Sequence, residues 1–175
     1  SSPAVTKDMV FIASDNGDLY AMGFDIELPK IESSDPTDEE TNVDVYQNIT
    51  ITFDEELDTS TLSTTNLMLK DSQDDDVSGG VTWDMGSKKV YFTPDSHLIK
   101  DESYTFTVTT AVTDSHGNQI DGNDNGIADA PEIDEFIIGF TTVPHYPPTI
   151  GNIPTLKPTE DVTYKINLST VINDL

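Results

Sequence analysis

Short segments in which apolar and polar residues alternate dominate this chain from residue 43 onward, and they constrain its fold more than any other feature. Every second residue is apolar in Ile49–Phe53 and in Tyr104–Val108. A period of two residues indicates a strand with one buried face and one exposed face. Further apolar positions of this kind are Leu67 and Leu69, Val81 and Trp83, Val90 and Phe92, and Phe136, Ile138 and Phe140.

Turn-forming residues separate these segments, and no window has the apolar period of an amphipathic helix. The turns are Ser78–Gly80, Met85–Ser87, Pro94–Asp95 and His116–Asn118. Asp58–Leu62 predicts a single helical turn, because Asp and Ser cap helices well. Short strands at this spacing predict an all-β sandwich. Leu98 precedes Tyr104 by six residues, which predicts a tyrosine corner and supports a Greek-key arrangement.

Residues 43–143 resemble the bacterial Ig-like domains of surface-layer and cell-wall proteins, and the resemblance extends back to about residue 30. It is carried by Ile49–Phe53 with Leu57–Leu62, Val90–Pro94, Leu98 with Ser103–Val108, Val112–Asn118 and Gly139–Thr142. The resemblance implies an Ig-like Greek-key β-sandwich that serves as an extracellular spacer or scaffold. The acidic segment from Ile120 to Asp134 departs from the pattern as an insertion before the last strand.

Short β fragments are expected at both ends of the sandwich. Residues 1–23 predict a hairpin that turns at Asp15–Asp18. This segment resembles part of a pyrroloquinoline-quinone-type β-propeller repeat, and a single repeat cannot form a closed propeller. Residues 24–42 are expected to form an acidic linker and a first strand. Residues 144–175 begin with a Pro-rich linker, and from about residue 148 they resemble the start of a cadherin-like or Ig-like repeat. Both chain ends are expected to continue into a longer protein.

The charge of the chain excludes several classes of partner. It carries 33 acidic residues and 8 basic ones, which gives a net charge of −25. Such a surface repels phosphate backbones, so nucleic-acid binding is not expected. No apolar run approaches the ~20 residues needed to span a bilayer, so this stretch of chain is not expected to insert into a membrane. Cysteine is absent, which leaves the compartment undecided on that criterion.

One motif predicts a metal site. Residues 121–132 fit the twelve-residue calcium loop D-x-[DN]-x-[DN]-G-x5-E, in which alternate residues supply the hard oxygen atoms that calcium prefers. Gly126 permits the sharp turn. The expected ligands are the side chains of Asp121, Asn123, Asn125, Asp129 and Glu132, and the backbone carbonyl of Ile127.

The surroundings of this motif differ from those of a paired EF-hand. No flanking helices are expected, Pro131 lies inside the loop, and two of the side-chain ligands are neutral amides. Weak calcium binding is therefore expected, with a dissociation constant on the order of 10⁻⁴–10⁻³ M, as in extracellular modules. The alternative interpretation is a solvated acidic loop rich in turn formers.

Nothing in the sequence predicts catalysis. Asp-Ser-His occurs at residues 95–97 and 114–116, but a catalytic triad needs members that converge from separate segments. His97, His116 and His145 lack zinc-ligand spacing. Trp83 is expected to pack against the sheet, and Tyr91 to face solvent.

Three functions remain open. The first is a non-catalytic spacer of a multi-domain extracellular or cell-surface protein, whose partners are neighbouring domains of the same chain and whose loop is stabilised by calcium. The second is an adhesion module that binds a glycan or a cell-surface protein. The third is an accessory domain of a propeller-containing enzyme.

Overall fold

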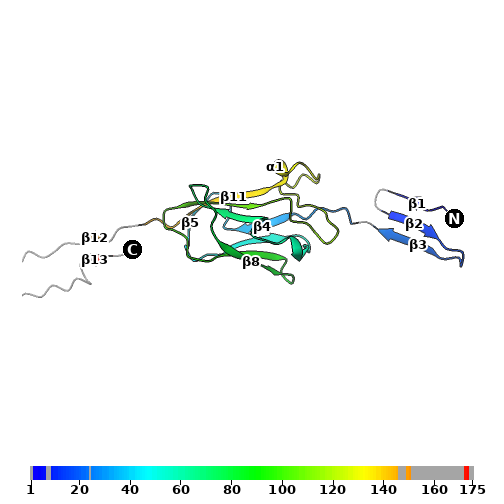
Figure 1. The fold of residues 1–175 in the computed structure, drawn as a ribbon, viewed down its shortest axis with the longest axis horizontal. Coiled ribbons are helices and arrows are strands. Elements are labelled where there is room, and N and C mark those ends of the chain that lie inside the picture. The colour runs from blue at the N-terminus through cyan, green and yellow to red at the C-terminus, as the bar shows by residue number, and fades with distance from the viewer. Residues whose placement is uncertain (1, 7–8, 24, 146–148, 151–171, 174–175) are drawn as a thin grey trace, which may run out of the picture. The chain divides into compact units, whose positions relative to one another are not determined.

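The computed structural model describes residues 2–6, 9–23, 25–145, 149–150 and 172–173 (Figure 1). Two four-stranded sheets build the main domain. The first has the order β4-β6-β9-β8, with β4 Ile31–Asp35, β6 Ile49–Phe53, β9 Lys89–Pro94 and β8 Gly79–Asp84. The second has the order β5-β11-β10-β7, with β5 Glu40–Val43, β11 Phe136–Thr142, β10 Ser103–Val108 and β7 Leu67–Lys70.

The strands follow the alternation seen in the sequence. In β6 the burial alternates along the strand, with Ile49, Ile51 and Phe53 buried. In β10 the buried residues are Tyr104, Phe106 and Val108. Neighbouring strands along the chain repeatedly lie in different sheets, since β6 and β9 belong to one and β7 and β10 to the other. The prediction of an all-β sandwich is confirmed.

The sandwich begins earlier in the chain than residue 43. The first strand expected within residues 24–42 is β4, which pairs antiparallel with β6. A second strand, β5, follows after Pro36 and pairs parallel with β11 in the other sheet. The acidic stretch from Asp35 to Glu40 therefore forms the turn by which the chain passes from one sheet to the other, and Pro36 within it is buried.

Apolar side chains from both sheets meet in one core. The rings of Phe92 in β9 and Phe106 in β10 pack edge to face with centroids 5.6 Å apart, and this contact joins the two sheets. Ile120, just before the acidic insertion, is fully buried. The insertion thus starts from a residue that is anchored in the core.

The helical turn and the tyrosine corner predicted from the sequence are both present. The 3₁₀ turn η1 spans Thr59–Thr61, and the side chain of Asp58 accepts a hydrogen bond from the Ser60 N–H. The backbone N–H of Ile99 donates to the Tyr104 hydroxyl at 2.9 Å. The phenol therefore fastens the connection that leads into β10.

Replacing Tyr104 by phenylalanine is expected to destabilise the domain by about 1–2 kcal/mol, because the part-buried hydrogen bond from the Ile99 N–H loses its acceptor. Urea unfolding followed by tryptophan fluorescence measures this change. Tyr91→Phe is the control, since no hydrogen bond of the Tyr91 hydroxyl is seen among the described residues. Equal stability of Tyr104→Phe and the parent chain would contradict a stabilising role for the corner.

The N-terminal strands form a separate sheet of the order β1-β2-β3, with β1 Ala4–Val5, β2 Met9–Ala13 and β3 Leu19–Gly23. The predicted hairpin is confirmed, and Gly17 in its turn has φ +91°. Its resemblance to a propeller repeat stays a prediction. Beyond Val143 the structure describes β12 Thr149–Ile150 and its partner β13 Ile172–Asn173. Most of the expected cadherin-like repeat, residues 151–171, lies outside the described residues.

Candidate functional site

The acidic insertion forms a closed loop between Ile120 and β11. The Gly122 N–H donates to the Asp134 carbonyl at 3.0 Å, which joins the two ends of the loop. The Asp121 N–H donates to the Pro29 carbonyl, so the loop is also tied to the segment that precedes β4. Pro131 opens the short helix α1 Pro131–Asp134 at its first position, where a missing N–H costs nothing.

Asp121 is the most strongly held of the predicted ligands. Its side chain is 1% exposed, and its carboxylate accepts hydrogen bonds from the N–H groups of Asn125 at 3.1 Å and Gly126 at 2.6 Å. Gly126 has φ +77°, a conformation that favours glycine. The backbone at Asn125 and Gly126 thus curves around the carboxylate of Asp121.

Asp134 lies two residues beyond the predicted motif and is fully buried. Its carboxylate accepts from the Asn123 side-chain amide at 2.9 Å and from the Asp129 N–H at 2.5 Å. Asn125 in turn donates its side-chain amide to Asp129 at 2.7 Å. The loop therefore encloses two buried carboxylates, one at each end, and the sequence predicted only the first of them.

The remaining predicted ligands differ in position. Glu132 is exposed on α1, and its side chain makes no hydrogen bond or ion pair among the described residues. The Ile127 side chain is exposed, and its N–H donates to the Asn125 side-chain oxygen. The structure thus gathers Asp121, Asn123, Asn125 and Asp129 around the loop, and leaves Glu132 on its outer side.

One lysine lies at the mouth of the loop. The Lys30 ammonium contacts Asp124 at 2.5 Å, and this hydrogen bond raises the pKa of Lys30 above its ordinary value. Within the described residues, no lysine forms an ion pair with Asp121, Asp129 or Asp134. Inside the loop the carboxylates of Asp121 and Asp134 accept hydrogen bonds from backbone and amide N–H groups, and the Lys30 ammonium acts on Asp121 only through an electrostatic interaction.

A second polar cluster surrounds His116. Burial opposes ionisation of Asp114, but hydrogen bonds from Asn118 and from the His116 N–H outweigh it and lower the pKa of Asp114. The neighbouring Glu55 behaves in the opposite way. Its partial burial, together with the charges of Asp114, Asp25, Asp54 and Glu27, raises the pKa of Glu55 to about 7. Negative charge is therefore crowded at this point.

The Asp-Ser-His sequence at 114–116 does not form a catalytic triad. Ser115 Oγ lies 3.3 Å and Asp114 Oδ2 lies 3.7 Å from the same ring nitrogen, Nδ1 of His116. A triad needs the nucleophile on one ring nitrogen and the carboxylate on the other, so that a proton can be taken from the hydroxyl. In the other such sequence, the His97 ring contacts the Tyr46 ring in a tilted arrangement, with centroids 5.6 Å apart.

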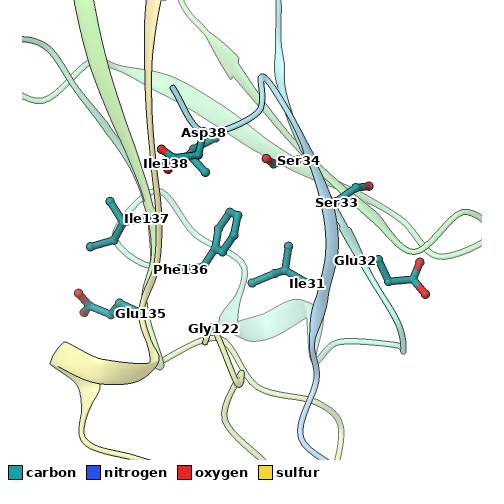
Figure 2. Close-up of a pocket in the computed structure, with 10 residues that line it drawn as sticks. All are labelled: Ile31, Glu32, Ser33, Ser34, Asp38, Gly122, Glu135, Phe136, Ile137 and Ile138. Atoms are coloured by element: carbon teal, nitrogen blue, oxygen red, sulfur yellow. The ribbon is translucent and has the colours of Figure 1, made fainter. Parts of the chain in front are cut away.

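A groove of about 440 Å³ opens between β4 and the first half of β11. Figure 2 shows Ile31 and Phe136 directed toward one another across it, while Glu32 and Glu135 point outward on opposite sides. The carboxylates do not converge on a common point. The groove thus lacks the paired acid and base that hydrolytic chemistry requires.

Trp83 and Tyr91 lie on opposite faces of their sheet. Trp83 packs edge-on against Phe53 with centroids 6.4 Å apart, on the core side of β8. Tyr91 is paired across the strands with Thr82, whose side chain points away from the core. The prediction of a packing role for Trp83 is confirmed, and the two rings share no platform.

Among the described residues, no helix is long and apolar enough to cross a membrane. No curated protein matches the sequence of this chain. Among solved structures, the surface-layer protein SbsC, domains 1–6, is similar with 16% identity and a TM-score of 0.46, over 85% of this chain and 18% of that one. CopC from Methylosinus trichosporium OB3b is similar with 13% identity and a TM-score of 0.48, over 68% of this chain and 97% of that one. The chain thus spans less than a fifth of the length of SbsC.

These structural likenesses are too distant to carry an argument about function. The sequence model of a family described as bacterial Ig-like domain matches residues 25–142, which is most of the chain and includes both sheets of the sandwich. The match begins before β4, in agreement with the early start of the fold. The chain therefore belongs to the bacterial Ig-like domain family.

Proposed function

We propose that this chain is a non-catalytic structural module of a multi-domain cell-surface protein, and that calcium stiffens its 121–134 loop. Membership of the bacterial Ig-like family supports the structural role. The surface charge supports an exposed, solvated module, because like charges keep such chains apart. Neighbouring domains of the same protein are the proposed partners.

The observation that carries the calcium proposal is the pair of buried carboxylates, Asp121 and Asp134, at the two ends of one loop. Burying charge is costly unless it is compensated, and a divalent cation compensates two carboxylates at once. Asn123, Asn125 and Asp129 add oxygen atoms on the same loop, and the Ile127 carbonyl is the proposed backbone ligand. We assign the closing carboxylate to Asp134, since Glu132 lies on the exposed side of α1.

A bound cation at this loop has a structural consequence. The Asp121 N–H is bonded to Pro29, and Lys30 pairs with Asp121 as an isolated β-bridge. Calcium would therefore stabilise the loop, the start of β11 and the segment entering β4 together. This fits a structural module in which the segment that leads into β4 is held in a fixed conformation.

Calcium is expected to stabilise the domain by about 1.4–2.7 kcal/mol at ten to a hundred times the dissociation constant. Thermal unfolding in EDTA and then in calcium measures this effect as a rise of several degrees in the midpoint temperature. Calcium is added up to ~10 mM, a concentration chosen for a dissociation constant on the order of 10⁻⁴–10⁻³ M. Magnesium should produce a smaller rise, because it demands stricter octahedral geometry.

Matched variants assign the ligands. Asp121→Asn and Asp134→Asn should each abolish the calcium response, while Glu132→Gln should retain it. If Glu132→Gln loses the calcium response and Asp134→Asn keeps it, the carboxylate that completes the calcium shell is Glu132 and not Asp134. A parent chain whose stability is the same in EDTA and in calcium would reduce the loop to a solvated acidic insertion.

A further inference from the structure

The strongest unassigned feature is a convergence of His116 with two carboxylates that come from opposite parts of the chain. One ligand atom each from Asp25, Asp114 and His116 lies within 4.8 Å of the others. Asp25 precedes β4, whereas Asp114 and His116 belong to the connection between β10 and β11. The fold therefore brings together residues about ninety positions apart, which no local motif requires.

The distances in this cluster match those between ligands that share one metal ion. Nδ1 of His116 lies 3.3 Å from Asp25 Oδ2 and 3.7 Å from Asp114 Oδ2. An N–H···O hydrogen bond has a usual length of about 2.9–3.0 Å. Two ligands bound to one tetrahedral zinc ion, at about 2.0–2.2 Å each, lie roughly 3.4 Å apart. The imidazole nitrogen thus faces two carboxylate oxygens at the spacing that a shared ion would impose.

The Asp114 carboxylate is held in place by its surroundings. The Asp114 carboxylate is 1% exposed and accepts hydrogen bonds at 2.8 Å from the N–H groups of His116 and Asn118 and from the Asn118 side-chain amide. The same amide donates to the Asp25 carbonyl at 3.3 Å. Metal ligands in proteins are oriented by hydrogen bonds of this kind from neighbouring groups. Asn118 accordingly positions the Asp114 carboxylate and contacts the backbone of Asp25.

The negative charge around this cluster also favours the binding of a cation. The Glu55 carboxylate interacts electrostatically with Asp114 and Asp25 of this cluster, and also with Asp54 and Glu27. In the part of the chain that the structure describes, no lysine forms an ion pair with Asp25, Asp114 or Glu55. The imidazole of His116 is the one cationic group seen in contact with Asp25 and Asp114 there, and it is cationic only when protonated.

We propose that Asp25, Asp114 and His116 form a second metal site, distinct from the calcium loop, that takes a divalent transition metal of the zinc class. Imidazole nitrogen favours zinc, copper and nickel ions, whereas calcium prefers an all-oxygen shell. Glu55 or water completes the coordination. The site would clamp the segment before β4 to the connection after β10.

Isothermal titration calorimetry with zinc tests this proposal. The protein is first treated with EDTA and dialysed to remove bound metal. One equivalent of zinc should bind to the parent chain. His116→Gln should weaken that binding at least about tenfold, since it removes the nitrogen ligand that selects zinc, and Asp25→Asn should weaken it severalfold. His97→Gln is the matched control and should bind zinc like the parent, because His97 is exposed and lies outside the cluster.

Two further readouts separate this site from alternatives. Cobalt, used as a visible-light probe, should give a d–d absorption band in the parent chain, and Asp25→Asn should need a severalfold higher cobalt concentration to reach the same intensity. Asp134→Asn should keep the zinc isotherm unchanged, which separates the site from the calcium loop. The proposal is overturned if the parent binds no zinc, or if His97→Gln loses as much affinity as His116→Gln. If His116→Gln fails to fold, equal zinc affinity in Asp25→Asn and the parent overturns it.

Discussion

Replacing Phe106 by alanine is expected to lower the free energy of unfolding by about 3–5 kcal/mol, the largest effect of any single change considered. Phe106 is fully buried in β10, and its ring packs on Phe92 from the other sheet. Truncation removes apolar contacts and leaves a cavity between the sheets that the β-strands cannot close. Urea unfolding measures the change as a lower midpoint with a similar denaturant slope.

Ile137→Ala is the matched control for this prediction. Ile137 lies in the neighbouring strand β11 and is 54% exposed. Its truncation should change the stability by less than about 0.5 kcal/mol, as for most surface positions. A similar loss in both variants would mean that the two sheets do not share a core at Phe106.

Replacing Gly122 by alanine is expected to destabilise the domain by about 2–3 kcal/mol, the second largest effect. A Cβ atom at this position would overlap the Asp134 carbonyl oxygen and lie 2.8 Å from the Phe136 nitrogen. Both are backbone atoms that cannot move aside without displacing the start of β11. The substitution should also disturb the hydrogen bond that closes the acidic loop, and so reduce the response to calcium.

Gly80→Ala controls for the general effect of replacing glycine in this fold. A Cβ atom at Gly80 would meet nothing within 4 Å, and its φ is not positive. Its stability should stay within about 0.5 kcal/mol of the parent. Equal thermal stability of Gly122→Ala and Gly80→Ala would contradict the close approach of the loop to β11.

The fold was predictable wherever burial alternates along a strand. In β6 and β10 the apolar residues at every second position predict which face of the strand is buried. Tyr104 predicts the tyrosine corner that leads into β10. Strand β5 was not predictable in this way. Its sequence Glu40–Val43 is largely polar, and its pairing with β11 depends on a partner about a hundred residues away.

The candidate sites were predictable only in part, for a related reason. The calcium motif identifies Asp121, Asn123, Asn125 and Asp129 by local spacing alone. Asp134 falls outside the twelve-residue pattern, and its burial results from the way α1 turns the chain back on Gly122. The contact between Asp25 and His116 is tertiary, so no spacing of residues could reveal it.

The most direct test of the central claim is a calcium titration followed by ¹H–¹⁵N NMR of the folded chain. Saturable shifts are expected at the amides of Asn125, Gly126 and Asp129, which donate to the Asp121 and Asp134 carboxylates. Their midpoint should fall on the order of 10⁻⁴–10⁻³ M, and the amides of β8 should not move. Shifts that rise without saturation along all acidic loops, or none at the three loop amides, would contradict calcium binding by this loop.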